Sequence, residues 1–429
     1  MSSAASVARR RFSPRVEWWA LWLMGCGGGV VFVEPSPYEL AFALAFLVFI
    51  VGGLRMGAGA VVLITLLMIF NTGGLFSLIP FLHDGDAVMF IAISYYLAIT
   101  AVFIAAVIQN DSDARLHALK WGCVCGAVIA SSAGVLGYFN VAGLGSVFTL
   151  FGRASGTFKD PNVLGTFVIL PLVLLTQDIL TSRRLRPGVL AAFAIILFGG
   201  VFLSFSRGAW GHAVFSIALT VGLTFLLTAG ARLRRRIVML SIAGVGVLAT
   251  GLLALLSIEE VGAMFQDRAS LTQAYDIGET GRFGRYSRAL PELLDRPAGY
   301  GPLQFRHFWL EDPHNVYLNA FSSYGWLGGV AYLTLIVATL VVGWRSVAMA
   351  GPTQPFAIAV WSTLFVQILQ GFTIDTDHWR HFYLLLGLTW GLFDIGRRRE
   401  AIHRDAARWK AGEPVRNPGS RAIVTADLR

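Results

Sequence analysis

Long apolar stretches recur along almost the whole chain and are separated by short polar connections. A stretch of roughly 17–25 apolar residues is long enough to cross the hydrocarbon core of a bilayer as a helix. We therefore expect an all-α, polytopic integral membrane protein with about twelve transmembrane helices. The predicted spans are residues 16–33, 38–54, 57–80, 86–108, 119–138, 162–180, 188–204, 209–230, 237–257, 324–343, 355–374 and 382–395.

The composition supports a membrane protein. The 429 residues are 55% hydrophobic and only 14% charged, whereas charged residues make up roughly a quarter of a typical soluble domain. The net charge of +9 comes largely from basic clusters in short connections, where such clusters report membrane orientation. We therefore expect contact with membrane lipids and no nucleic-acid partner.

The positions of the basic residues predict how the helices are oriented. Cytoplasmic connections carry an excess of Lys and Arg, and with twelve spans the basic clusters all fall on one side of the membrane. We expect that side to be the cytoplasm, so both termini are cytoplasmic. The clusters lie at residues 9–15, 183–186, 232–236, 345 and 397–399.

The opposite side receives one long loop, residues 258–323, in which we expect short amphipathic helices. The chain then divides into N-terminal transmembrane helices (1–138), a transmembrane core that includes this loop (139–395), and a basic cytoplasmic tail (396–429). The arginines of the tail predict attraction to anionic lipid of the inner leaflet.

Two segments place cationic residues on the outer side of the membrane. Residues 151–162 carry Arg153 and Lys159 and end in an Asp-Pro-Asn turn that includes Asn162. Such a segment is also typical of a plain loop with snorkelling cations beside a helix start. Arg207 lies in one of the shortest connections of the chain. Charges held at membrane depth are costly and usually kept for function, so we expect Arg207 to be functional.

The long loop contains a third cationic segment. Residues 281–290 predict an amphipathic helix with Arg282, Arg285 and Arg288 on one face. That face can bind a phosphate or lipid headgroups, or can simply be solvated. Pro291 is expected to end or kink the helix.

His314 and Asn315 form the fourth segment, where the long loop returns to the membrane. Histidine is one of the few side chains that can move a proton near neutral pH. A lone loop histidine is more often a surface or capping residue, but His314 lies on the same side as the arginines. We therefore expect it to act as a base.

These four segments together predict one reaction. Guanidinium groups match the oxygens of a phosphate in a bidentate manner, so a cluster of them suits a lipid diphosphate held at the bilayer surface. The imidazole can deprotonate an attacking hydroxyl. We expect transfer of a glycosyl group from a lipid diphosphate to an alcohol, and direct displacement would invert the anomeric centre.

The order and spacing of the segments resemble those of the O-antigen ligase and O-antigen polymerase superfamily of bacterial inner-membrane glycosyltransferases. The resemblance covers roughly residues 145–390. It rests on Gly156-Thr157-Phe158, Asp160-Pro161-Asn162, Ser206-Arg207-Gly208, Gly281-Arg282, Pro297, Gly299, Gly301, His314-Asn315, Gly325 and Gly328.

The resemblance implies an undecaprenyl-diphosphate-linked saccharide as donor and a glycan or lipid-anchored glycan as acceptor. It implies a base role for His314 and a leaving-group role for Arg207 and Arg282, at a site that faces the periplasm. The process would be the biosynthesis of a cell-surface polysaccharide, either lipopolysaccharide or exopolysaccharide. The remaining substrate-binding candidates are Arg153, Lys159, Asn162, Arg285, Arg288 and Asn315.

A metal site is the alternative for the segment Asp375-Thr376-Asp377 with His378 and His381. Carboxylates beside histidines can bind a divalent cation. The segment can equally be a solvated connection whose aspartates pair with Arg380. Because the arginines already neutralise a diphosphate, we expect neither a metal nor another cofactor.

Two other classes of protein fit part of the pattern. A secondary transporter often has about twelve spans, but it places ionisable groups near the bilayer midplane. Here we expect spans almost free of ionisable side chains, with His212 as an exception. A flippase for lipid-linked saccharides would also need arginines, but it would not need the base that His314 offers. A polymerase of the same superfamily would differ from a ligase only in its acceptor.

Overall fold

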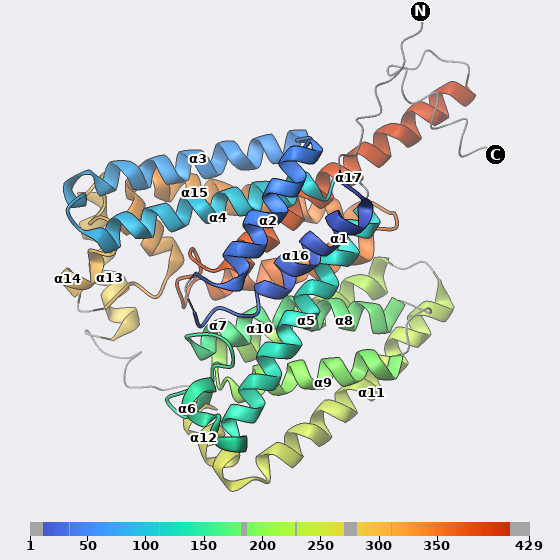
Figure 1. Ribbon diagram of the computed structural model, residues 1–429, viewed down its shortest axis with the longest axis horizontal. Helices are drawn as coiled ribbons and strands as arrows, with labels where there is room; N and C mark the ends of the chain where they lie inside the picture. Colours follow the sequence, from blue (N-terminus) through green and yellow to red (C-terminus); the bar gives the residue numbers. More distant parts are fainter. Residues whose placement is uncertain are drawn as a thin grey trace, which may run out of the picture.

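The computed structural model describes residues 12–33, 35–110, 112–181, 187–227, 230–269, 281–309 and 311–411, and most of these residues lie in helices (Figure 1). The first helices are α1 (Pro14–Gly27), α2 (Pro37–Gly52), α3 (Ala58–Leu78), η1 (Ile79–Phe81), α4 (Gly85–Val107) and α5 (Ser112–Tyr138). A short connecting region follows, with η2 (Val141–Gly143), α6 (Gly145–Phe148), β1 (Thr149–Leu150) and β2 (Arg153–Ala154). The two strands pair in an antiparallel manner.

The remaining helices complete the bundle and the long loop. They are α7 (Pro161–Phe167), α8 (Ile169–Thr181), α9 (Pro187–Leu203), α10 (Arg207–Leu227), α11 (Ala231–Leu256), α12 (Glu259–Ala269), α13 (Arg282–Leu294), α14 (Phe305–Trp309), α15 (Val316–Ala348), α16 (Gln354–Gln370) and α17 (Arg380–Lys410). Each of the twelve predicted spans overlaps a helix, which confirms the all-α, polytopic prediction.

Seven helical stretches of the described chain are long and apolar enough to cross a membrane. They are α3 with η1, α4, α5, α7 with α8, α10, α11 and α15. Two shorter apolar helices, α2 and α9, lie among them. α11 shows the membrane character most directly, because its apolar side chains are largely exposed and only Ile237 is buried.

Glycines let pairs of these helices pack closely. α15 packs on α3, α1 on α5, and α17 on α4. A Cβ added to Gly73 of α3 would lie 2.4 Å from the backbone nitrogen of Gly328 in α15, so the two backbones touch at this crossing. Small residues at such crossings are how membrane helices gain packing contacts. Figure 1 shows α3, α4 and α15 running side by side, away from α8, α9 and α11.

Charged side chains near the ends of several predicted spans are paired with one another. Glu17 accepts a hydrogen bond from Arg115 at 2.7 Å, and both side chains are buried. Lys120 and Asp178 form a second pair at 2.7 Å. Pairing explains why these charges are tolerated, since a buried charge is far more costly when it lacks a partner.

His212 and Asp394 also have hydrogen-bond partners inside the bundle. The two ring nitrogens of His212 lie 2.9 Å from Gln370 Oε1 and 2.9 Å from the carbonyl oxygen of Thr363. Asp394 accepts from the backbone N–H of Gly59 at 2.9 Å, at the start of α3. These polar groups link helices to one another instead of lining a path through the membrane.

The long loop contains α12, α13, α14 and the first turns of α15, as predicted. Of the two outcomes expected at Pro291, an end of the helix is wrong, because α13 continues to Leu294. Leu293 is buried, and its carbonyl oxygen accepts from Trp326 Nε1 at 2.8 Å. These contacts stabilise the last turn after the proline.

Candidate active site

The start of α15 determines where His314 lies. Asn315 is the N-cap, and its Oδ1 accepts from the N–H groups of Tyr317 at 3.0 Å and Leu318 at 3.1 Å. His314, just before the cap, has a φ of +50°, in the left-handed region that non-glycine residues seldom adopt. Asp375 accepts from the N–H groups of His314 and Asn315, each at 2.9 Å.

A second contact holds the same turn from the other side. Tyr286 Oη in α13 donates to the carbonyl oxygen of His314 at 2.8 Å. A left-handed non-glycine residue costs on the order of 1–3 kcal/mol and persists only where its surroundings impose it. Asp375 and Tyr286 impose it here, so two neighbouring segments set the backbone conformation of His314.

Arg207 lies at the same end of α16 as His314. Arg207 is the first residue of α10, and a Cβ added to the next residue, Gly208, would lie 2.9 Å from Nε2 of Gln370. The carbonyl oxygen of Gly371, the residue after Gln370, accepts from the N–H of Val316 at 2.8 Å. The end of α16 therefore joins the Arg207 segment to the His314 segment.

Arg153 joins its own segment, residues 151–162, to the turn that precedes Arg207. Its Nε donates to the carbonyl oxygen of Ser204 at 2.8 Å, and its Nη2 donates to Oδ1 of Asn162 at 2.9 Å. The side chain is buried, and Ser204 precedes the turn at Phe205, where φ is +46°. Arg153 and Asn162, both predicted to bind substrate, therefore contact each other and brace the turn that leads to Arg207.

The arginines of α13 have separate surroundings. Arg285 is buried and donates to Glu311 at 2.6 Å and to the carbonyl oxygen of Trp309 at 3.3 Å. Arg288 lies over the ring of Trp309, with 5.4 Å from guanidinium carbon to ring centre. Arg285 thus joins α13 to the segment before His314. The side chain of Arg282 lies outside the described part of the structure.

The segment between α16 and α17 supplies two carboxylates with different tasks. Burial and the charge of Asp377 raise the pKa of Asp375 to about 8, although its two backbone N–H donors act in the opposite direction. Asp377 accepts from Asn319 Nδ2 and lies against His378 Nδ1, both at 3.1 Å.

His378 lies between Asp377 and α4. Its other ring nitrogen lies 3.0 Å from the carbonyl oxygen of Phe90, so both nitrogens face acceptors. Burial lowers the pKa of His378, but the charge of Asp377 and the two hydrogen bonds outweigh burial and raise it. The picture of a solvated connection is therefore wrong, and Arg380 pairs with Glu39 at 2.8 Å instead of with the aspartates.

Sequence reasoning missed the role of Asp375. It treated the aspartates as a possible metal site, whereas Asp375 faces the His314 turn and Asp377 faces Asn319 and His378. No spacing in the sequence links Asp375 to His314, because α15 and α16 separate them.

Lys159 lies apart from this group. It lines a cavity between α1, α5, α7 and α17, and neither Arg207 nor His314 is among the described residues that line the same cavity. Contacts between neighbouring residues therefore connect the segments of Arg153 and Asn162, of Arg207, and of His314 and Asn315. Lys159 lies at a separate cavity.

The helices and this site define a polytopic membrane protein in which the Arg207 segment and the His314 turn meet at one end of α10, α15 and α16. Residues 192–333 match the family model described as O-antigen ligase. The match confirms the resemblance to the O-antigen ligase superfamily, and it includes Arg207, α13, His314 and the first half of α15. Comparison with curated proteins finds no match. The chain carries the domain of an O-antigen ligase- or polymerase-type membrane enzyme.

Proposed function

We propose that the protein transfers a saccharide from an undecaprenyl-diphosphate donor to an acceptor hydroxyl at the periplasmic face of the bacterial inner membrane. Both termini then lie in the cytoplasm. The observation that carries the proposal is the fixed His314 turn, held by Asp375 and Tyr286 beside the start of α10. A protein that only moves lipid-linked saccharide across the membrane would not need a base at this turn.

The reaction follows from the chemistry of these groups. His314 removes the proton of the acceptor hydroxyl, and the oxygen attacks the anomeric carbon as the bond to the diphosphate oxygen breaks. The electron pair of that bond leaves with undecaprenyl diphosphate. Arg207 and Arg282 stabilise the departing charge without a metal, and attack from the opposite face inverts the anomeric centre. Asn315 is the cap that holds His314 at the start of α15.

The same site serves a ligase or a polymerase, and the acceptor distinguishes them. A ligase uses a lipid-anchored core glycan, whereas a polymerase uses another lipid-linked repeat unit. We favour the ligase reaction because the matched family model is described as O-antigen ligase.

The test is release of lipid diphosphate by purified protein incubated with undecaprenyl-diphosphate oligosaccharide and a defined acceptor. We expect release only when an acceptor is present, and we expect His314→Ala to abolish it. Arg207→Ala should reduce the rate about 10²–10³-fold, as for loss of one well-placed donor to a developing negative charge.

The control variant is His307→Ala, which removes an exposed histidine of α14 on the same loop. It should transfer at the rate of the unmodified protein. Near-normal turnover by folded His314→Ala would remove the base from the mechanism. No release with any acceptor would favour a flippase.

A further inference from the structure

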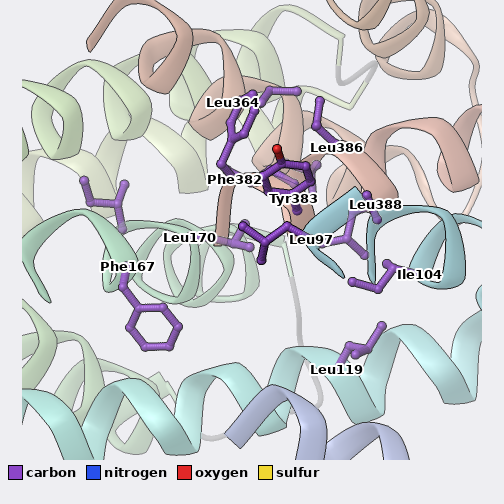
Figure 2. Close-up of a cluster of buried hydrophobic side chains, with 14 of the residues drawn as sticks. Leu97, Ile104, Leu119, Phe167, Leu170, Leu364, Phe382, Tyr383, Leu386 and Leu388 are labelled. Carbon is purple, nitrogen blue, oxygen red and sulfur yellow. The ribbon is translucent and has the colours of Figure 1, made fainter. Parts of the chain in front are cut away.

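A cavity of about 180 Å³ lies between α1, α2, α5, α7 and α17, outside the His314 site. Its lining includes both polar and apolar side chains. The polar ones are those of Lys159, Asp160, His378, Arg380 and His381. The apolar ones include Met24, Leu119, Cys123, Phe167 and Leu384. Figure 2 shows Phe167 and Leu119 projecting from their helices toward the space between them.

His381 is the informative residue of this cavity. Its side chain is only 6% exposed, and its Nε2 has no hydrogen-bond partner in the described part of the chain. Buried polar atoms are almost always paired, so an unpaired ring nitrogen on a cavity wall indicates that a bound group supplies the partner.

The other polar groups show what kind of group that is. His381 is the second residue of α17, whose N-terminus favours negative charge, and Lys159 adds a cation. The nearby carboxylates already have donors. Glu39 binds Arg380, and Asp160 accepts from the N–H of Asn162 at 2.6 Å. The group that fits beside His381 is therefore an anionic oxygen acceptor.

The apolar lining of the cavity indicates the other part of the ligand. Lys159 and His381 lie just before the predicted spans 162–180 and 382–395, whereas Met24, Phe167 and Leu384 lie within predicted spans. We propose that this cavity binds the phosphate ester of a membrane lipid, with the phosphate at His381 and Lys159 and the hydrocarbon chain along the apolar wall. The site does not depend on the proposed transfer reaction.

Native mass spectrometry of the delipidated, detergent-purified protein tests this site. The probes are undecaprenyl monophosphate, phosphatidylglycerol and inorganic phosphate, each added alone. We expect a one-to-one adduct with a lipid, and His381→Leu should weaken it about tenfold or more, as for loss of a hydrogen bond to a charged group. Whichever lipid binds identifies the source of the phosphate.

One stability measurement and two further variants keep the test independent of folding. His381→Leu should unfold at an unchanged temperature, because Nε2 loses no partner. Val163→Phe, which fills the apolar wall, should block the adduct while every polar group remains. His307→Leu, at the exposed histidine of α14, should bind lipid normally.

The outcomes separate this site from the proposed reaction. A lipid adduct that survives in His314→Ala, but not in His381→Leu, supports the cavity whatever the fate of glycosyl transfer. Equal adducts in the unmodified protein, His381→Leu and Val163→Phe would overturn the proposal. So would binding of inorganic phosphate with no lipid adduct.

Discussion

His314 owes its position to residues that are distant in the sequence. Its N–H is held by Asp375 and its carbonyl oxygen by Tyr286. Because its φ is +50°, loss of either contact lets the turn relax toward a more common conformation. We therefore regard Asp375 as a positioning residue for the proposed base.

Asp375→Asn should change the pH dependence of transfer. The pKa of Asp375 is raised to about 8, so the carboxyl is neutral below that pH and gains its charge above it. An ionised carboxylate is the stronger acceptor for the N–H groups of His314 and Asn315. We expect the rate to rise through about pH 8 in the unmodified protein, and this limb to vanish in Asp375→Asn. An unchanged pH–rate profile would contradict the positioning role.

The raised pKa of Asp375 should also make stability depend on pH, but in the direction opposite to that of the rate. Its pKa is higher in the folded protein than its ordinary value of 3.8, so unfolding releases a proton at intermediate pH. Its contribution to the free energy of unfolding is full below about pH 4 and is lost as the pH rises to about 8. Thermal unfolding in detergent should show this decline, and Asp375→Asn should flatten it.

Arg153 is expected to act through the Arg207 turn instead of on the substrate. Arg153→Met removes the donors to Ser204 and Asn162, and we expect it to lower kcat more than it raises KM. Arg153→Met combined with Arg207→Ala should be no slower than Arg207→Ala alone, because coupled residues do not add. Additive losses would instead indicate direct contact between Arg153 and the donor.

The element that organises the site is α15, which is interrupted at Gly325. There φ is +65° and ψ is −173°, and the turn that contains Pro297 and Gly299 docks against the break. Trp326 N–H donates to the carbonyl oxygen of Pro297 at 2.9 Å, and Tyr300 N–H donates to that of Ser322 at 2.8 Å. The glycines of the sequence motif therefore join the long loop to α15.

Gly299→Ala should separate this turn from α15. Gly299 has a φ of +71°, and an added Cβ would lie 2.3 Å from the carbonyl oxygen of Ser322. We expect a loss of stability of about 1–3 kcal/mol or more from the strain and the clash. Thermal unfolding measures the change.

Gly251→Ala is the matched control for this substitution. An added Cβ at Gly251 of α11 has no described atom within 4 Å, and alanine is the better helix former. Its unfolding temperature should stay the same or rise. Equal effects at the two glycines would show that the docked turn contributes little.

On the scale of the whole molecule, paired charges hold the bundle together across distant helices. Glu17 and Arg115 join α1 to α5, and Lys120 and Asp178 join α5 to α8. α17 continues past its predicted span to Lys410, while residues 412–429 of the predicted tail lie outside the described residues. The proposed orientation places this extension in the cytoplasm.

Cysteine labelling tests that orientation. In a background without the native cysteines, Ser287→Cys on α13 should react with an impermeant maleimide in intact spheroplasts. Glu400→Cys on the extension of α17 should react only after permeabilisation. Both side chains are exposed, so their labelling depends on sidedness. Labelling of both from outside would disprove the predicted orientation.

The helices were predictable because the transfer of each apolar stretch from water to lipid is a local property. Every predicted span overlaps a helix, and the candidate residues Arg207 and His314 lie within the matched domain. His314 stood out because an imidazole at the membrane boundary is chemically distinctive in so apolar a chain. Pro291 does not end α13, because a proline rule is local, whereas Leu293 accepts a hydrogen bond from Trp326 of α15.

Contacts between segments could not be predicted in this way, because they depend on which helices become neighbours. Asp375, Arg153 and Gly299 can all be read from the sequence, but their contacts cannot. Only packing places Asp375 against the N–H of His314, Arg153 against the carbonyl oxygen of Ser204, and Gly299 against the backbone of α15. The unpaired nitrogen of His381 likewise arises only when α17 meets α1, α5 and α7 around a cavity. Hydrophobicity along the chain selects the helices, and the packing of their polar and small residues builds the site.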